Sequence, residues 1–306
     1  MRRRIALVTG LVVLVTTASA LAATPEVIHD VEDVREFQPS RSEGYLVWTQ
    51  YTQGSTTFVM ADGGSAVKVN RPKTDSFGAA IDGTTIAYDE IDVTSDIMFF
   101  DADTEQRSEP PGGVNTQNWE EDPALSNDWL MFVRSNFERR RKAYARVILF
   151  NLDTSERRTL LDVPRNAYYV VTDQVNGDWA TYETCRTPGS GFVDCQVWLY
   201  QISTDTTIQV PNPGVQQYAG GVTSDGTVYL VRSGGPDHWE CGRNTRIVRV
   251  PLGGQARVIG ELPDRVDALT SFAFEEPYDS VTFYFERLRC RSGNSGIYAI
   301  RNADTA

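Results

Sequence analysis

The feature that most constrains this chain is a tight turn that recurs six times, at Gly44, Gly83, Asp128, Gly177, Gly226 and Asp279. Successive turns are 39 to 53 residues apart. Repeats of about 40 to 50 residues are typical of β-propeller blades. Each turn leads into a short run of β-branched and aromatic residues, at 45–48, 85–88, 129–133, 179–182, 227–231 and 281–285. These runs have the composition of β-strands.

A second polar turn closes a hairpin in every repeat, at 62–64, 101–104, 151–154, 203–206, 252–254 and 302–305. Asp and Asn side chains bond to their own turn backbone, so these segments have a physical reason to turn. No stretch after the N-terminal segment shows a helical period. We therefore expect an all-β fold, a six-bladed β-propeller.

The last repeat ends at its hairpin turn and leaves no residues for an outer strand. Residues 26–31, in contrast, precede the first repeat and have no partner there. If Val27, Ile28 and Val31 supply the outer strand of the sixth blade, no open sheet edge remains. We predict a ring closed in this way, with His29 as a structural residue on an outer strand, remote from the central channel.

The N-terminal segment resembles a secretory signal peptide. Arg2, Arg3 and Arg4 precede an apolar run, and Ala20-Leu21-Ala22 forms a small-x-small cleavage site. We expect a signal peptide at 1–22 and a single propeller domain at 23–306, in a secreted or extracytoplasmic protein. An uncleaved membrane anchor is the alternative interpretation.

The chain is strongly acidic. Its formal net charge is −12, and it becomes −15 when the three arginines of the leader are removed. Such a charge disfavours nucleic-acid binding and contact with anionic membranes. We expect a monomer without membrane insertion after cleavage, in which the acidity serves solubility or attracts a cation or basic partner.

All four cysteines follow the leader, so in an exported chain they are expected to form disulfides. The spacing favours Cys185 with Cys195 across a hairpin loop, and Cys241 with Cys290 between neighbouring blades. A zinc site is the rival interpretation, but there is no C-x-x-C pair and the only histidines are His29 and His238. We expect no metal and no cofactor.

The sequence contains no G-x-S-x-G, H-E-x-x-H or D-x-[DN]-x-[DN]-G motif. We therefore nominate no catalytic residue. Asp89, Glu90, Asp92 and Asp96 are a minor candidate for a cation site.

The candidate ligand-binding residues are in the loops between the second and third strands of the repeats, which share one face of a propeller. They are Arg139, Arg140, Arg141, Asp237, His238, Trp239, Arg287 and Arg291. The arginines suit a carboxylate or phosphate, and Trp239 suits a sugar or peptide. The structural alternatives are a solvated run of charge at 139–142 and a packed, disulfide-linked loop at 236–241.

Two segments resemble the repeats of the TolB-like, or WD40-like, propeller family. Thr223-Ser224-Asp225-Gly226 followed by Val228-Tyr229-Leu230 is similar to the turn and strand of that repeat, and Phe150-Asn151-Leu152-Asp153-Thr154 is similar to its hairpin. The resemblance implies the propeller fold and an exported protein that binds other molecules. It implies no catalytic residue, and the chain lacks the separate α/β domain of TolB itself.

Three functional hypotheses follow. The first is a secreted binding or scaffold module for an extracellular protein or glycan. The second is a secreted enzyme that acts on polysaccharide through paired loop carboxylates, which need no linear motif. The third is a structural protein of the cell envelope. The missing catalytic motifs favour a protein that is not an enzyme.

Overall fold

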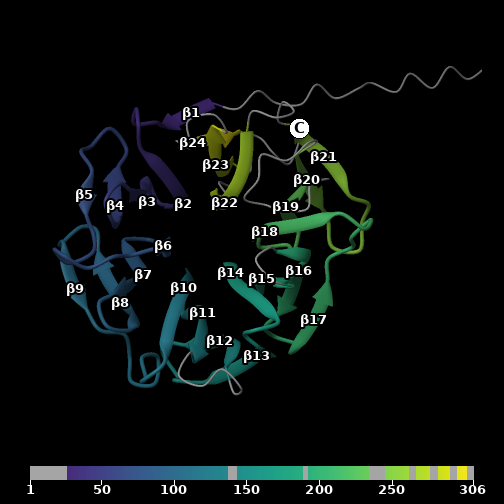
Figure 1. Cartoon of the computed structure of the whole chain (residues 1–306), viewed down its shortest axis with the longest axis horizontal. Helices are drawn as coiled ribbons and strands as arrows, with labels where there is room; N and C mark the ends of the chain where they lie inside the picture. Colours follow the sequence, from purple (N-terminus) through teal and green to yellow (C-terminus); the bar gives the residue numbers. More distant parts are fainter. Residues whose placement is uncertain are drawn as a thin grey trace, which may run out of the picture.

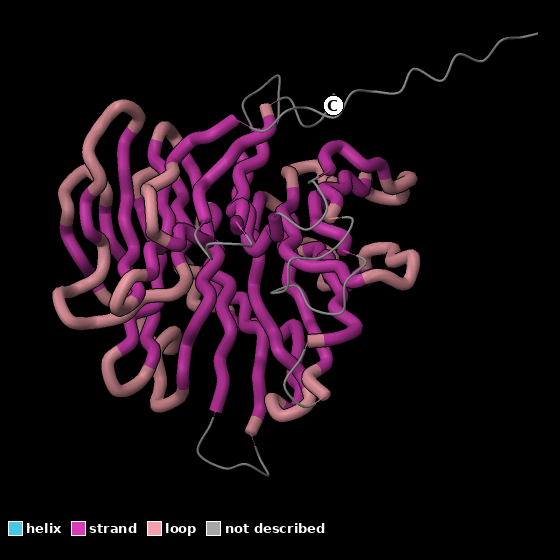
Figure 2. The backbone as a smooth tube through the Cα atoms, turned by 45° about the horizontal axis from the view of Figure 1, so that its top comes forward, coloured by secondary structure: helices cyan, strands magenta, loops and turns pink. Residues whose placement is uncertain are grey.

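The computed structural model describes residues 26–136, 143–188, 192–233, 245–261, 267–275, 282–289 and 295–301. These residues form 24 β-strands in six four-stranded sheets and contain no α-helix. The sheets stand around a common axis as the blades of a ring (Figure 1). A turned view shows strands running between two faces, where the loops lie (Figure 2). The predicted all-β six-bladed propeller is confirmed.

The strands of blades 1 to 3 are named from the axis outward. Blade 1 contains β2 (Arg35–Ser42), β3 (Tyr45–Tyr51), β4 (Ser55–Ala61) and β5 (Val67–Lys68). Blade 2 contains β6 (Ala79–Asp82), β7 (Thr85–Ile91), β8 (Ser95–Asp101) and β9 (Gln106–Ser108). Blade 3 contains β10 (Trp119–Ser126), β11 (Trp129–Asn136), β12 (Tyr144–Asn151) and β13 (Arg157–Pro164).

Blades 4 to 6 follow in the same order. Blade 4 contains β14 (Tyr168–Asn176), β15 (Trp179–Arg186), β16 (Val193–Gln201) and β17 (Thr206–Gln209). Blade 5 contains β18 (Gln216–Val222), β19 (Val228–Ser233), β20 (Arg246–Val250) and β21 (Arg257–Glu261). Blade 6 contains β22 (Asp267–Glu275), β23 (Thr282–Arg289), β24 (Ser295–Ile300) and, outermost, β1 (Glu26–His29).

Several predicted features lie outside the described residues: the signal peptide at 1–22, the turns at Asp279 and 302–305, and Cys241 and Cys290. No helix in the part of the chain that the structure describes is long and apolar enough to cross a membrane.

The middle strands are apolar on both sides because each blade is packed between two others. In β11, Leu130 and Phe132 contact blade 2, in a cluster with Ala87 and Ile97. The alternate residues of β11 face blade 4, where they join a cluster with Tyr182. Successive side chains of a strand point to opposite faces, so a continuous apolar run serves two interfaces.

Bulges interrupt five of the six described inner strands. The strand register shifts at 37–40, 121–124, 172–174, 218–221 and 269–272. Gln38 and Asp122, each followed by a proline, have positive φ values of 52° and 53°. Proline fits such positions because a bulge leaves backbone donors outside the ladder. A bulge changes the direction in which a side chain points. These bulges lie in the inner strands, beside the propeller axis.

Neighbouring inner strands approach closely at these bulges. A Cβ on Gly78 would lie 3.1 Å from Asp122 Cα, and a Cβ on Gly220 would lie 3.2 Å from Asp173 Oδ2. A side chain at either position would crowd the neighbouring strand, so glycine favours this approach. Thr172 Oγ1 also donates a hydrogen bond to the Asp122 carbonyl. Contacts of this kind join blades 2 to 5 around the axis.

The ring closes through β1. Strand β1 pairs antiparallel with β24, and Ile28 packs against Leu46, Trp48 and Ile297. His29 Nδ1 lies 2.7 Å from Glu36 Oε1 of blade 1. The predicted closure is confirmed, although the strand ends at His29 and does not include Val31.

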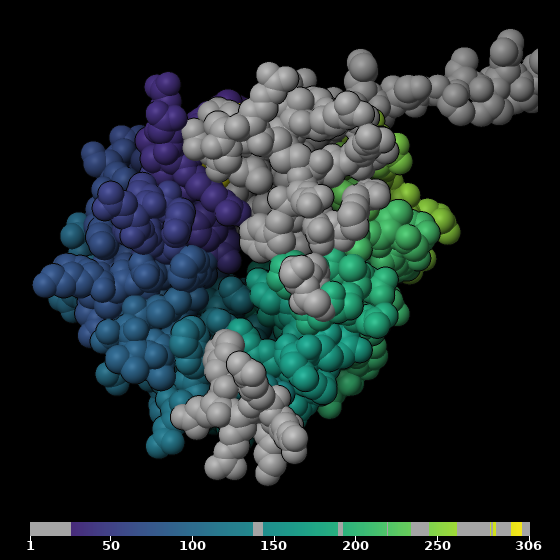
Figure 3. All heavy atoms as spheres, viewed as in Figure 1, coloured from purple at the N-terminus to yellow at the C-terminus, as the bar shows by residue number. Residues whose placement is uncertain are grey.

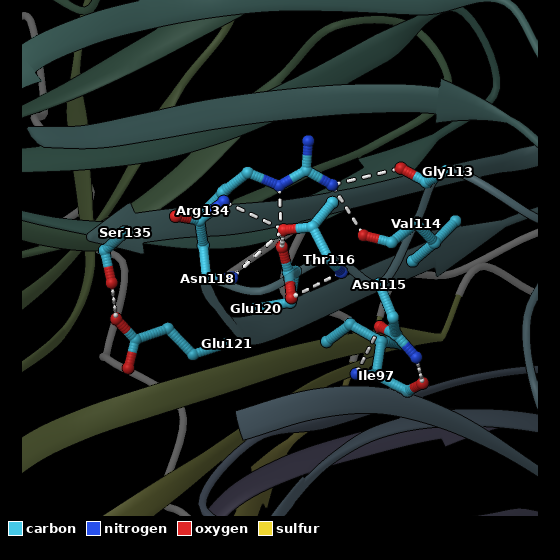
Figure 4. Close-up of polar contacts among 10 residues, drawn as sticks. All are labelled: Ile97, Gly113, Val114, Asn115, Thr116, Asn118, Glu120, Glu121, Arg134 and Ser135. Carbon is cyan, nitrogen blue, oxygen red and sulfur yellow. Dashed lines mark hydrogen bonds and ion pairs between the residues drawn. The ribbon is translucent and has the colours of Figure 1, made fainter. Parts of the chain in front are cut away.

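Side-chain amides cover strand edges where the outer strands are short. In blade 2, β9 pairs with only the last three residues of β8. Asn115 Oδ1 accepts a hydrogen bond of 2.9 Å from Ile97 N, and its Nδ2 donates one of 2.8 Å to Ile97 O (Figure 4). In blade 1, Asn70 Oδ1 accepts a hydrogen bond of 3.1 Å from Thr57 N. These amides take the hydrogen bonds that a longer outer strand would make.

A buried disulfide links β15 to β16. Cys185 and Cys195 are bonded, as predicted from their spacing, and both belong to an apolar cluster with residues of blades 5 and 6. The pairing of Cys241 with Cys290 stays a prediction.

Deleting residues 24–31 should lower the melting temperature and promote aggregation. The deletion leaves the edge of β24 unpaired and exposes the surface that Ile28 covers. Thermal unfolding followed by circular dichroism, with light scattering, measures both effects.

Two point substitutions separate loss of packing from a change of charge. Ile28→Asp should be destabilising, whereas Val27→Asp should change the free energy of unfolding by less than about 0.5 kcal/mol, because Val27 is mostly exposed. Unchanged unfolding of the deletion variant would contradict the role of β1 in closure.

Candidate functional site

Most of the ligand-binding residues predicted from the sequence lie outside the described residues. Arg139, Arg140 and Arg141 fall between β11 and β12, and Asp237, His238 and Trp239 fall between β19 and β20. Arg291 falls between β23 and β24, and Arg287 belongs to β23, where its backbone pairs with Leu269 and Gly296. Their role in binding stays a prediction.

Arg134, which opens the basic run of blade 3, has a structural role. Its Nε lies 2.7 Å from Glu120 Oε1, and both side chains are buried. Its Nη2 donates hydrogen bonds to the carbonyls of Gly113 and Val114, at 3.0 and 2.6 Å (Figure 4). Thr116 Oγ1 donates a further bond to Glu120. This network fixes the linker between blades 2 and 3.

A cavity of about 550 Å³ lies on the propeller axis. Its lining comes from the inner strands of blades 1 to 5, with a few residues from the second strands. A space-filling view shows the ring hollowed near its centre (Figure 3). Ligand sites in proteins are commonly cavities of this size, lined by apolar groups with a few polar ones.

Aromatic side chains mark one mouth of this cavity. They are Phe37, Tyr51, Phe77, Trp119 and Tyr169. Tyr51 and Phe77 are 50% and 40% exposed. Tyr51 ends β3, directly before the loop to β4, so this mouth opens on the face with the loops between second and third strands. That is the face to which the sequence assigned the ligand.

Five carboxylates line one side of the same cavity. This carboxylate wall consists of Asp89, Glu121, Asp122, Asp173 and Glu183, from blades 2, 3 and 4. Asp122 and Asp173 occupy inner-strand bulges. Arg165 also lines the cavity, and its Nη1 lies 2.9 Å from Glu121 Oε1. Carboxyl groups therefore outnumber arginines on this wall.

Asp89 is held by backbone donors. The side chain is 1% exposed, and its Oδ1 accepts hydrogen bonds of 2.6 and 2.9 Å from the amides of Phe77 and Gly78. Burial nevertheless raises the pKa of Asp89 to about 6, because the loss of solvation outweighs these bonds.

Burial and neighbouring negative charge also raise the pKa values of Asp122, Asp173 and Tyr169. Burial, followed by repulsion from Glu121 and Asp89, raises the pKa of Asp122 well above its usual range. Burial and repulsion from Glu183 do the same to the pKa of Asp173. The pKa of the Tyr169 hydroxyl is raised too, first by burial and then by repulsion from Asp122. Groups with perturbed pKa values in a cavity are characteristic of functional sites.

The wall is not arranged as a metal centre. Among the described residues, Glu183, Cys185 and Cys195 are the one group of three potential ligands close enough to share an ion, and the two sulfurs are bonded to each other. The acidic residues that were the minor candidate for a cation site do not all face the cavity. Asp89 lines it, whereas Glu90 forms an ion pair of 2.5 Å with Arg71.

The sequence contained a weak signal for the wall. Glu121-Asp122 and Asp173 interrupt strand-like segments shortly before the first turns of blades 3 and 4. The site residues predicted from the sequence are all expected in loops and do not include these carboxylates.

Comparisons with known proteins show likeness at the level of fold. No family model and no curated protein matches the sequence. TolB from Acinetobacter baumannii has a TM-score of 0.52 and 12% identity, over 84% of this chain and 64% of TolB. An oligogalacturonate lyase in complex with manganese has a TM-score of 0.53 and 12% identity, over 90% of this chain and 84% of the lyase.

The β-propeller domain of the Trilobed protease from Pyrococcus furiosus has a TM-score of 0.52 and 12% identity, over 87% of this chain and 82% of that one, and an open velcro topology. In our protein β1 closes the ring instead. The chain thus has the TolB-like six-bladed propeller fold, as its repeats implied. It spans less than two thirds of the length of TolB.

The free energy of unfolding should rise as the pH falls from 7 to about 4. A carboxyl whose pKa is raised in the folded state contributes stability that is fully present below the unfolded pKa, near 4, and lost as the pH rises through the folded pKa. For Asp89, with a folded pKa of about 6, this amounts to about 3 kcal/mol.

Urea unfolding at several pH values checks this effect. Asp89→Asn keeps the Oδ1 acceptor but does not titrate, so its slope with pH should be shallower. Asp162→Asn, on the exposed surface of β13, is the control. Identical slopes for Asp89→Asn and the wild type would contradict the prediction.

Proposed function

We propose that this protein is an extracytoplasmic propeller that binds a protein or glycan ligand at its central channel, as a binding or scaffold module. The observation that carries the proposal is the axial cavity of about 550 Å³, with aromatic groups at its mouth and charged groups inside. Aromatic rings offer contact area to a peptide or a sugar at low entropic cost.

The compartment is supported by the chemistry of the cysteines. A buried disulfide between Cys185 and Cys195 is expected in an oxidising environment outside the cytoplasm. The signal-peptide pattern at 1–22 agrees with this location.

The basic segment Arg139–Arg141 and the residues Asp237–Trp239, Arg287 and Arg291 complete the proposed site at the rim. In sequence, all but Arg287 belong to segments between second and third strands, on the face where the aromatic mouth opens, and Arg287 lies near the end of β23. They would contact acidic or polar groups of the ligand, while the channel receives the rest.

A secreted enzyme acting on polysaccharide is the second candidate. Asp89, with a pKa of about 6, shares its wall with other carboxylates, as an acid and base pair would require. Release of reducing ends from a polysaccharide, abolished by Asp89→Asn, would support this candidate over a binding module.

Filling the channel should abolish ligand capture. Val171 lines the cavity, and Val171→Trp would occupy its space. Val258→Trp adds the same bulk to an exposed position on β21. Immobilised wild-type protein and Val258→Trp should retain the same extracellular component, identified by mass spectrometry, and Val171→Trp should not. Equal retention by Val171→Trp would exclude the channel as the site.

Replacing Arg139, Arg140 and Arg141 together with Ser should weaken the captured complex and reduce its dependence on salt, because exposed charges are screened within about 8 Å at physiological ionic strength. Titration calorimetry at two salt concentrations measures both effects. The melting temperature should not change. Unaltered affinity and salt dependence would rule out the basic rim.

A further inference from the structure

We propose that the carboxylate wall binds the guanidinium group of an arginine side chain presented by a protein ligand. This inference rests on the proposed function, because it takes the channel as the ligand site. It specifies which of the two ligand classes enters the channel and by which group.

The composition of the wall favours a cationic group. It gathers five carboxylates from three neighbouring blades, and burial, followed by their mutual repulsion, raises the pKa values of Asp122 and Asp173. Arg165 is bonded to Glu121, and repulsion at Asp122 persists in its presence. A cationic ligand group would relieve this repulsion, whereas a neutral sugar would not.

One carboxylate oxygen of the wall lacks a well-aligned donor. Asp173 Oδ2 is buried and has no hydrogen bond of good geometry from the described residues, although the Gly220 amide stabilises the carboxylate and Asp173 lines the cavity. Gly220 packs against this oxygen, since a Cβ there would lie only 3.2 Å away. Buried acceptors are normally satisfied. An N–H group that reaches Asp173 from the cavity would supply the missing bond.

The spacing of the carboxylates indicates which kind of cation would fit the wall. In the described part of the chain, no three carboxylates of the wall lie close enough together to share one metal ion. A point charge would thus leave some of them unpaired. A guanidinium group is planar and carries five N–H donors in a fixed fork, so it can serve acceptors on separate strands.

The aromatic side chains at the mouth of the cavity are also suited to an arginine side chain. Trp119 and Tyr169 line the cavity together with the wall. Trp119 begins β10, and Tyr169 is the second residue of β14, so they are near the same end of the inner strands. Arginine stacks on aromatic faces, and its alkyl stem packs on apolar surface. A side chain entering from this mouth would pass the rings before it reached the carboxylates.

The test compares two probes of nearly equal size, N-acetyl-arginine amide and N-acetyl-citrulline amide, by titration calorimetry at neutral pH. The arginine probe should bind at least roughly tenfold more tightly, because only it forms charge-assisted hydrogen bonds. Calcium chloride and manganese chloride are titrated alone in parallel.

Substitutions in the carboxylate wall test whether the arginine probe binds there. Asp122→Asn with Asp173→Asn should weaken the arginine probe by at least roughly tenfold. Asp162→Asn with Glu261→Gln, on the exposed strands β13 and β21, removes the same charge and should have no effect. Circular dichroism verifies folding, and Asp173→Asn alone replaces the double variant if that variant does not fold.

Three outcomes would overturn the inference: equal affinity for citrulline, unchanged affinity in the double variant, or binding of a metal ion to the wall without binding of arginine. Failure of the arginine contact can be distinguished from failure of the proposed binding at the channel. A ligand lost from Val171→Trp but retained fully by the double variant would support channel binding and refute the arginine contact.

Discussion

The close approach of neighbouring inner strands determines the shape of the channel. Gly78 packs against Asp122, and Gly220 packs against Asp173, so a bulge of one blade lies against the backbone of the next. Hydrogen bonds reinforce this contact: Ser40 Oγ accepts from Ile81 N at 3.1 Å, and Gln174 Oε1 accepts from Val222 N at 2.9 Å. The spacing of the blades, and with it the cavity, depends on these small contacts.

The direction of each side chain at these bulges also determines which carboxylates have hydrogen-bonding or ion-pair partners. Glu120 and Glu121 are neighbours in β10 and point to opposite sides of the strand. Glu120 faces the blade interface, where Arg134 and Thr116 satisfy it. Glu121 faces the axis, where Ser135 binds its Oε1 (Figure 4) and Arg165 binds the same atom. The interface has a buried ion pair, whereas the channel has more carboxyl groups than arginines. Such an imbalance is costly in a fold and is usual at sites that bind.

The architecture could be predicted from the sequence because it depends on local signals. Turn residues, β-branched strands and the missing outer strand of the last repeat specify six blades and their closure, and a spacing of ten residues specifies the disulfide between Cys185 and Cys195. The carboxylate wall could not be predicted in this way. A bulge shifts the alternation of a strand, so the sequence does not reveal which of Glu120, Glu121 and Asp122 faces the axis. Arg134 likewise resembles part of an exposed basic run until its buried partner is known.

The amides of Asn70 and Asn115 have a consequence for how this protein meets others. They occupy hydrogen-bonding groups of Thr57 and Ile97 that the two shortest outer strands leave uncovered. A peptide that docks by extending a sheet needs a row of free backbone groups. At these two positions a side chain already occupies the backbone groups that an added strand would use. A strand pairing with β4 at Thr57 or with β8 at Ile97 would first have to displace the amide.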